Sequence, residues 1–264
     1  MSGRQLVWRT NLRANLILWP EVAPNIAALA QSDGEPYDEE ALLDKISSFG
    51  GGKEASDTRS VRNTFEIMAL SGLAMREGSP PRLRLTGHGS SLFSFLLPGE
   101  AGRFAVEGNR RLAAEYVIRA LSVVLEYRAI WALWRQCGNV LTNEELNRGM
   151  ARLDVVASVP EAASSIRKAR AMNDPTAIGP RLYEETKFTT TPNDQRKAIN
   201  PLFLLAGGGR LFVKMEDDRR IIEEWAVGLI DQALIQDLPD LIAGTSPDTA
   251  QLMSDYACAP QAVI

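Results

Sequence analysis

The sequence predicts a mainly helical protein that carries small β-hairpins. Apolar residues recur at helical spacing in several stretches, and short alternating stretches are joined by a turn rich in glycine and proline. Of the 264 residues 45% are apolar and 23% are charged, which excludes a disordered chain. We expect an N-terminal domain over residues 1–98, a helical domain over 103–235 and a weakly structured acidic tail over 236–264.

The first third of the chain carries successive helix signals. An apolar-periodic stretch over residues 16–30 follows a short predicted strand. Asp38 is placed to cap a helix over 39–49, which the glycines at 50–52 end. A further helix is predicted from about residue 57 to Ala69, because Val61, Phe65 and Met68 share one face and Ser71-Gly72 follows.

A hairpin is predicted directly after this helix. Residues 73–76 and 82–85 alternate between apolar and polar, and the turn Glu-Gly-Ser-Pro-Pro separates them. Leu85 and Thr86 end the second strand, and Gly89 and Leu92 belong to a following apolar helix.

The segment 58–92 resembles the recognition helix and wing of winged helix-turn-helix domains. Val61, Phe65, Met68, Gly72-Leu73, Leu85-Thr86, Gly89 and Leu92 carry the resemblance, which extends over about 18–97 with the preceding helices. The loop over 50–56 departs from the family, because it is longer and richer in glycine than the usual turn.

The resemblance implies that the helix over 57–70 contacts the major groove of double-stranded DNA and that the wing over 73–86 contacts its backbone or minor groove. Arginine and asparagine recognise base edges, and arginine and lysine bind phosphates. The expected DNA contacts in this module are Lys53, Thr58, Arg59, Arg62, Asn63, Arg76, Arg82 and Arg84.

The second half has signals in the same order. A long helix over 110–136, which can break into two pieces, precedes a helix over 142–153 with a capping box from Thr142 to Glu145. A helix over 160–172 and a hairpin over 198–215, turned by the glycines at 207–209, would follow. The second half is predicted to be either a second winged helix or a helical dimerisation or docking domain. The expected DNA contacts in this second half are Arg167, Lys168, Arg170, Arg196, Lys197, Arg210 and Lys214.

Charge is unevenly distributed along the chain. Residues 162–214 hold nine basic and four acidic side chains, whereas residues 215–264 hold two basic and ten acidic ones. This asymmetry predicts either an anionic partner near 162–214 or internal pairing between the two blocks. The net charge of −4 argues against a generic polycation that coats nucleic acid.

Catalytic and metal sites are not expected. His88, the single histidine, is expected in an exposed turn, and no nucleophile elbow surrounds the neighbouring serines. The two cysteines have no metal spacing, and the glycine runs at 50–52 and 207–209 lack the P-loop pattern. We therefore predict no metal, no cofactor and no enzymatic activity.

No targeting signal is recognised. The arginines near the N-terminus are not followed by an apolar segment, and the apolar stretch over 112–133 carries four charged residues. A cytoplasmic protein with reduced thiols is expected.

Two functions remain open. The first is a non-enzymatic DNA-binding protein, either a transcription regulator that dimerises through the 110–136 helix or a DNA-targeting subunit. The second is a non-catalytic adaptor in a multi-protein DNA-processing or phage-defence complex, whose winged helices dock on protein. An enzyme is the weakest hypothesis, because no motif has enzymatic geometry.

Overall fold

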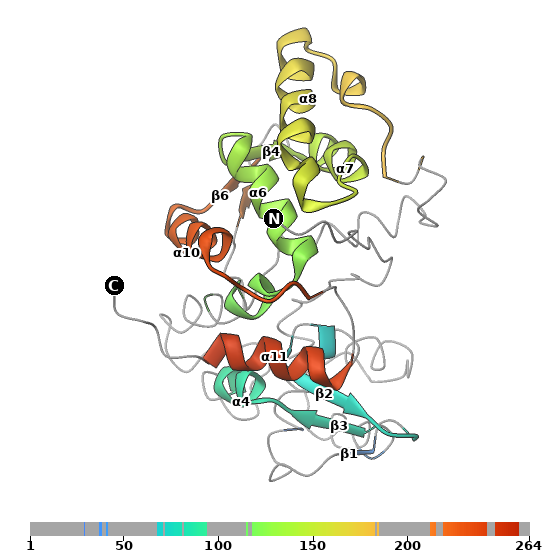
Figure 1. Cartoon of the computed structure of the whole chain (residues 1–264), viewed down its shortest axis with the longest axis vertical. Coiled ribbons are helices and arrows are strands. Elements are labelled where there is room, and N and C mark those ends of the chain that lie inside the picture. Colours follow the sequence, from blue (N-terminus) through green and yellow to red (C-terminus); the bar gives the residue numbers. More distant parts are fainter. Residues whose placement is uncertain are drawn as a thin grey trace. The chain divides into compact units, whose positions relative to one another are not determined.

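A computed structural model shows a mainly helical chain with two small antiparallel sheets (Figure 1). The described residues are 29, 37–38, 41, 68–70, 72–80, 82–93, 115, 118–182, 184, 212–214, 219–241 and 246–258. They divide into two units. We call the unit drawn from 15–121 and 244–264 the terminal unit, and the unit drawn from 122–203 and 211–243 the central unit.

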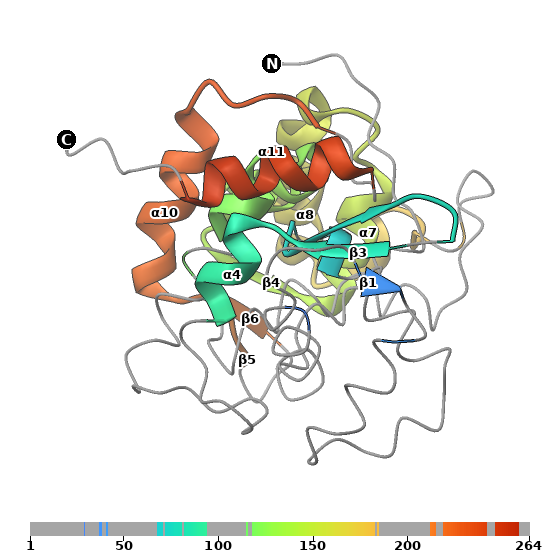
Figure 2. The same ribbon diagram turned by 90° about the horizontal axis from the view of Figure 1, so that it is seen from below.

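The described part of the terminal unit contains a three-stranded sheet and the helices α4 and α11, besides shorter helical stretches such as 68–70. Its strands are β1 (Tyr37–Asp38), β2 (Ala74–Glu77) and β3 (Arg82–Leu85), in the order β1-β3-β2. Helix α4 (Gly87–Phe93) follows β3, and helix α11 (Pro247–Cys258) packs on α4 and β2 (Figure 2). The hairpin and the helix after it are therefore confirmed.

The central unit is built around α6 (Leu125–Gln136), whose Trp131 and Trp134 are fully buried. Strand β4 (Val140–Thr142) and helices α7 (Asn143–Ala151) and α8 (Val159–Met172) follow, with short 3₁₀ turns η1 (Val156–Ser158) and η2 (Pro175–Ile178) beside α8. Strands β5 (Phe212–Lys214) and β6 (Arg219–Ile222) and helix α10 (Glu224–Ile235) complete it. The strand order is β4-β6-β5.

Local signals placed the first helices of the central unit correctly. The predicted capping box is present: the Thr142 hydroxyl accepts the Glu145 N–H at 3.1 Å, and the Glu145 carboxylate accepts the Thr142 N–H at 2.9 Å. The predicted break in the long helix is also present, because residues 123–124 separate helical residues 118–122 from α6. At Val124 the chain makes a parallel bridge to Leu241 instead.

The predicted hairpin over 198–215 is described only at 212–214, which form β5 and pair with β6, whereas residues 198–211 with the triple glycine lie outside the described residues. Two sequence predictions need correction. The helix predicted from Asp218 begins at Glu224, because 219–222 pair with β4 and β5. Part of the predicted weak tail is α11, whose Ala250 and Met253 are fully buried.

Candidate nucleic-acid interface

The structure describes six of the expected contact side chains, namely Arg76, Arg82, Arg84, Arg167, Lys168 and Arg170. Lys214 is described only as a backbone position at the end of β5. The remaining expected contacts lie outside the described residues: Lys53, Thr58, Arg59, Arg62, Asn63, Arg196, Lys197 and Arg210.

The end of the 57–70 segment is helical and firmly anchored. Met68 and Ala69 are fully buried, and the Leu73 N–H donates to the Met68 carbonyl at 2.8 Å. Gly72 then turns the chain with φ of +70°, a conformation that other residues rarely adopt. The predicted helix end at Ser71-Gly72 is therefore confirmed, and it fixes where the segment meets the hairpin.

The hairpin places its arginines on two faces. Successive side chains of a strand point to opposite sides, and Arg76 lies opposite the buried Leu83. Arg82 and Arg84 therefore share the other face, where Arg82 lies directly opposite Glu77 on β2 and Asp38 on β1.

Acidic neighbours offset the positive charge of this outer face. Arg84 forms an ion pair with Glu77 at 3.6 Å, with about two fifths of each side chain exposed. Arg82 is exposed between two carboxylate-bearing positions. Because exposed pairs of this kind are weak, a phosphate could replace the carboxylates as partner.

The Leu-Thr-x-x-Gly pattern joins the hairpin to α4. The Thr86 hydroxyl donates to the Gly72 carbonyl at 2.5 Å and accepts the Gly89 N–H at 3.1 Å. A Cβ on Gly89 would lie 2.1 Å from the Leu73 carbonyl oxygen, so only glycine fits. The role of these residues is structural, because Thr86 and Gly89 are used to fix the geometry of the wing.

His88 does not lie in an exposed turn, contrary to expectation. It is the second residue of α4, is fully buried, and donates its backbone N–H to the Ser254 hydroxyl of α11 at 3.0 Å. Burial lowers the pKa of His88 to about 3, because the charged imidazolium loses its hydration. The expectation of an exposed turn was wrong because α11 packs over α4. The residues around His88 in the sequence contain no signal of this contact.

The two arginines of α8 are used inside the central unit. Arg170 holds the Glu145 carboxylate at 2.7 and 3.0 Å, and this bond raises the pKa of the guanidinium above its ordinary value. The same guanidinium donates to the carbonyls of Cys137 and Val140. Arg167 donates to the Gln136 carbonyl at 2.9 Å. Both arginines thus serve carbonyls at or just beyond the C-terminus of α6.

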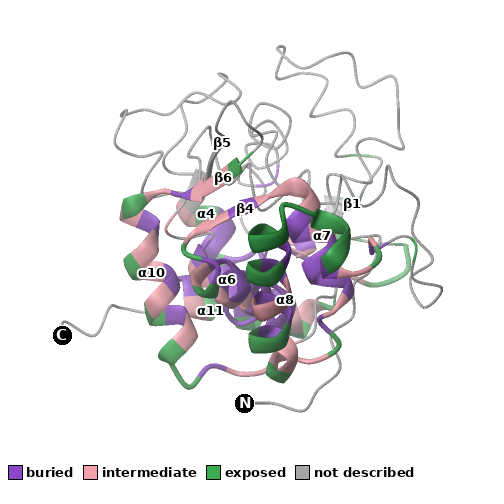
Figure 3. Ribbon diagram, turned by 90° about the horizontal axis from the view of Figure 1, so that it is seen from above, coloured by how far each residue is buried: buried purple, intermediate pink, exposed green. Residues whose placement is uncertain are grey.

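The solvent face of α8 carries more basic than acidic side chains. Glu161, Arg167, Lys168 and Arg170 are exposed there, and Figure 3 shows exposed stretches along α8. The guanidinium groups of Arg167 and Arg170 are at the same time engaged with groups of the central unit. The connection of the β5–β6 hairpin adds the acidic residues 216–218. The described part of the central unit therefore presents a weaker attraction for phosphate than its arginine content predicts.

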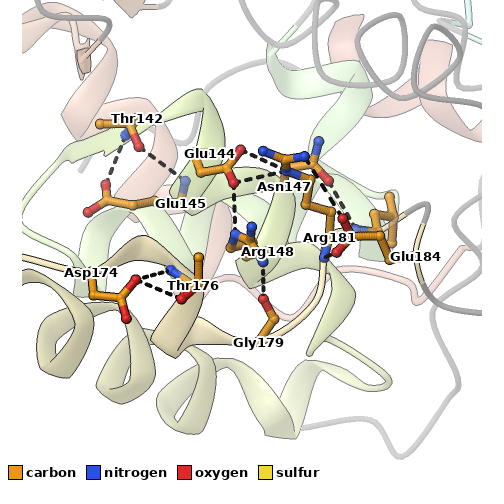
Figure 4. A network of polar contacts seen from close by, with 11 residues as sticks. Thr142, Glu144, Glu145, Asn147, Arg148, Asp174, Thr176, Gly179, Arg181 and Glu184 are labelled. Atoms are coloured by element: carbon orange, nitrogen blue, oxygen red, sulfur yellow. Dashed lines mark hydrogen bonds and ion pairs between the residues drawn. The ribbon is translucent and has the colours of Figure 1, made fainter.

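A network of ion pairs, which the sequence did not reveal, fastens residues 174–184 to α7 (Figure 4). Glu144 accepts from Arg148 at 2.8 Å and from Arg181 at 2.9 Å. The Arg148 guanidinium also donates to the Gly179 carbonyl, and the Asn147 amide oxygen accepts the Leu182 N–H. The network covers one side of α7.

Among the described residues, the acidic side chains of residues 215–264 pair with α6 and not with the basic side chains of residues 162–214. Asp231 binds Arg135 through both oxygens at 2.6 and 2.7 Å, and Asp240 binds Arg128 at 2.6 Å. The described ion pairs therefore do not join residues 162–214 to the acidic block, so internal pairing of the predicted kind is not seen in this part of the chain.

Within the described residues no group of three or more His, Cys, Asp or Glu is arranged to hold a metal ion. None of the described helices is both long and apolar enough to cross a membrane. Comparison with protein-family models gives no match, and comparison with curated proteins gives no similar sequence.

Proposed function

We propose that the chain is a non-enzymatic DNA-binding protein with two winged-helix modules, of which the terminal unit supplies the main DNA contacts. The recognition helix would be the 57–70 segment, and the wing would be the β2–β3 hairpin. Arg59, Arg62 and Asn63 would contact base edges, while Arg82 and Arg84 would contact the backbone.

The strand order β1-β3-β2 carries this proposal. A short strand before the helices pairs with the second strand of the hairpin that follows them, as Tyr37 does with Leu83. In the proposed module this pairing would enclose the two predicted helices and the hairpin around one core and so hold the recognition helix against DNA.

The central unit supports a tandem arrangement. Its order β4-β6-β5 repeats the same pairing, with Val140 of the strand before α7 opposite Ile221 of the hairpin's second strand. In both units the elements follow one another as strand, helical region, hairpin and further helix. A repeated plan without evident sequence repetition is consistent with two winged helices.

The test is fluorescence anisotropy with a random-sequence 30-base-pair duplex at two salt concentrations. Wild type should bind, and its affinity should fall steeply with salt because phosphate contacts release counterions. Arg59→Ala/Arg62→Ala should lose most of this affinity, at about 1–3 kcal/mol per base-reading arginine.

A charge-matched variant sharpens the test. Arg59→Lys/Arg62→Lys keeps both positive charges and removes the bidentate geometry, so it should retain non-specific binding and lose sequence preference. No binding by wild type at low salt, or unchanged binding by the alanine variant, would refute the role given to these arginines.

A second candidate function is favoured by the charges of the described residues. Arg167 and Arg170 are engaged within the central unit, and residues 216–218 are acidic. These features suit a module that docks on protein in a larger DNA-processing or defence assembly. A stable complex whose formation is unaffected by Arg59→Ala/Arg62→Ala, together with no DNA binding, would select this candidate.

A further inference from the structure

The outer face of the β2–β3 hairpin carries basic and acidic side chains next to one another. Arg82 and Arg84 on β3 share this face with Glu77 on β2, because Glu77 is the cross-strand neighbour of Arg82. On the other side of Arg82 stands Asp38 of β1, its partner in the register of that pair. The charges of these two arginines and two carboxylates cancel, so this described part of the face has no net charge.

Arg84 is poorly satisfied by its contacts within the chain. Its guanidinium lies 3.6 Å from a Glu77 carboxylate oxygen, which is longer than an ordinary hydrogen bond. Its other contact is the Met75 sulfur at 4.0 Å, a weak acceptor. The Arg84 Nε–H is enclosed and has no hydrogen-bond partner among the described residues. A stronger acceptor at this position would therefore find donors of Arg84 that are not fully used.

The Glu77 carboxylate occupies the place that a phosphate would take. Arginine binds carboxylate and phosphate through the same planar fork of donors. Glu77 lies directly across the ladder from Arg82 and one diagonal position away from Arg84, so it neighbours both arginines. About two fifths of the Glu77 and Arg84 side chains are exposed, so a ligand in solution can reach the pair.

We propose that Glu77 limits the affinity of the hairpin for DNA phosphates, because it pairs with Arg84 and faces Arg82 in the free protein. This inference rests on the proposed function, in which the two arginines contact the DNA backbone. Binding is then an exchange: the arginines leave the carboxylate and take a phosphate diester, without a net gain of an ion pair. Asp38 acts in the same way on Arg82, from the other neighbouring strand.

The exchange also affects how binding depends on salt. A protein cation that neutralises a DNA phosphate releases about 0.9 counterion, which makes the affinity fall with salt. When Glu77 loses its arginine partner, its carboxylate attracts a cation from solution and offsets part of this release. The salt slope of the wild type is therefore smaller than its arginines alone predict, and Glu77 affects two measurable quantities, the affinity and its salt dependence.

Anisotropy titrations of the random-sequence duplex with the full chain, over a series of salt concentrations, test the proposal. Glu77→Gln keeps the size of the side chain and removes its charge, so the affinity at low salt should rise about threefold, as expected for loss of an exposed competing ion pair. The slope of log affinity against log salt should steepen by up to about 0.9 for each phosphate contact that no longer displaces a carboxylate. Asp38→Asn should act in the same direction, and it keeps an acceptor for the Ala41 N–H.

Two controls separate competition at the hairpin from a change of overall charge. Asp255→Asn removes one negative charge from α11, where the exposed carboxylate accepts from Gln251 of the same helix, and it should change the affinity much less than Glu77→Gln. Arg82→Gln/Arg84→Gln removes the donors for which Glu77 competes. In that background most of the gain from Glu77→Gln should disappear, because the residues act through one another.

The outcomes that contradict the proposal differ from those that contradict DNA binding. Equal binding by wild type and Glu77→Gln shows that the carboxylate does not compete, and it leaves the DNA-binding function standing. An equal gain from Asp255→Asn, or a full gain without Arg82 and Arg84, assigns the effect to overall charge and overturns the role of Glu77. Absence of binding by both wild type and Glu77→Gln at low salt refutes the DNA-binding function, and this inference with it.

Discussion

Replacing Gly89 with alanine is expected to destabilise the terminal unit by about 3 kcal/mol. In an exposed helix the same change would stabilise by about 1 kcal/mol, because alanine has the higher helix propensity. In α4, however, the added Cβ would lie 2.1 Å from the Leu73 carbonyl oxygen and 2.9 Å from a methyl group of Leu85. The sign of the effect is therefore set by packing.

The magnitude follows from what must move. The Leu73 carbonyl accepts the Thr86 N–H at 3.1 Å, and the Thr86 hydroxyl, whose single proton is directed to the Gly72 carbonyl at 2.5 Å, lies 3.1 Å from the same Leu73 oxygen. A backbone oxygen cannot rotate away as a side chain can, so relief of the clash disrupts these buried bonds. Each lost bond costs about 1 kcal/mol, and leaving the buried groups unsatisfied adds about 1–3 kcal/mol.

Two other helical glycines provide matched controls. Gly228 in α10 has open space around a built Cβ, so Gly228→Ala should stabilise by about 0.5–1 kcal/mol. Gly149 in α7 would meet the ends of two buried side chains, Leu133 at 2.9 Å and Ile166 at 3.1 Å. Those ends can shift, so Gly149→Ala should cost about 1 kcal/mol net.

Urea unfolding followed by far-ultraviolet circular dichroism measures the series. The expected order of stability is Gly228→Ala above wild type, then Gly149→Ala, then Gly89→Ala. A Gly89→Ala protein as stable as wild type would refute the close approach of α4 to the turn at Leu73. Equal effects at Gly89 and Gly228 would refute the argument from packing altogether.

Three further predictions concern the central unit. Arg170→Met should destabilise by about 2 kcal/mol in urea unfolding, because the nearly buried Glu145 carboxylate loses its ion-pair partner and the Cys137 and Val140 carbonyls lose a donor. Lys168→Ala on the same helix should change stability by less than about 0.5 kcal/mol. Thr142→Ala should cost about 1 kcal/mol through loss of the capping box, and Thr142→Ser should restore most of it. Burial raises the pKa of the Cys137 thiol to about 11, so at pH 8 iodoacetamide should label the exposed Cys258 alone, and rapid labelling of both thiols would contradict this burial.

Features encoded by neighbouring residues could be predicted from the sequence. The turn at Gly72, the hairpin over 73–85 and the capping box at Thr142 each depend on a few adjacent side chains. Such signals act through local conformation and short hydrogen bonds, which the residue types specify. The order of helices and hairpins along the chain follows from them.

Strand β6 shows where local signals mislead. Its four residues, Arg-Arg-Ile-Ile, fit the start of the helix that follows. They form β6 because Ile221 pairs with Val140, a residue far away in the chain. A strand of this length is stabilised by pairing with its partner strand. The partner lies too far away in the sequence for neighbouring residues to indicate the pairing.

The candidate site was only partly predictable for the same reason. Residue type identified Arg167 and Arg170 as basic groups on a helix, and that helix is present. The direction in which these two side chains point is set by their hydrogen bonds to carbonyls at the end of α6, about thirty residues earlier in the chain. Likewise, burial of His88 depends on α11, 166 residues away at Ser254.

The discontinuity of the terminal unit has a consequence for the order of folding. Synthesis runs from the N-terminus, so α11 is made only after the whole central unit, although it packs on α4 and β2. The central unit can complete its core while α4 still lacks its cover. During that interval the buried surface around His88 is open to chaperones, to water and to neighbouring nascent chains, and α11 closes it after leaving the ribosome.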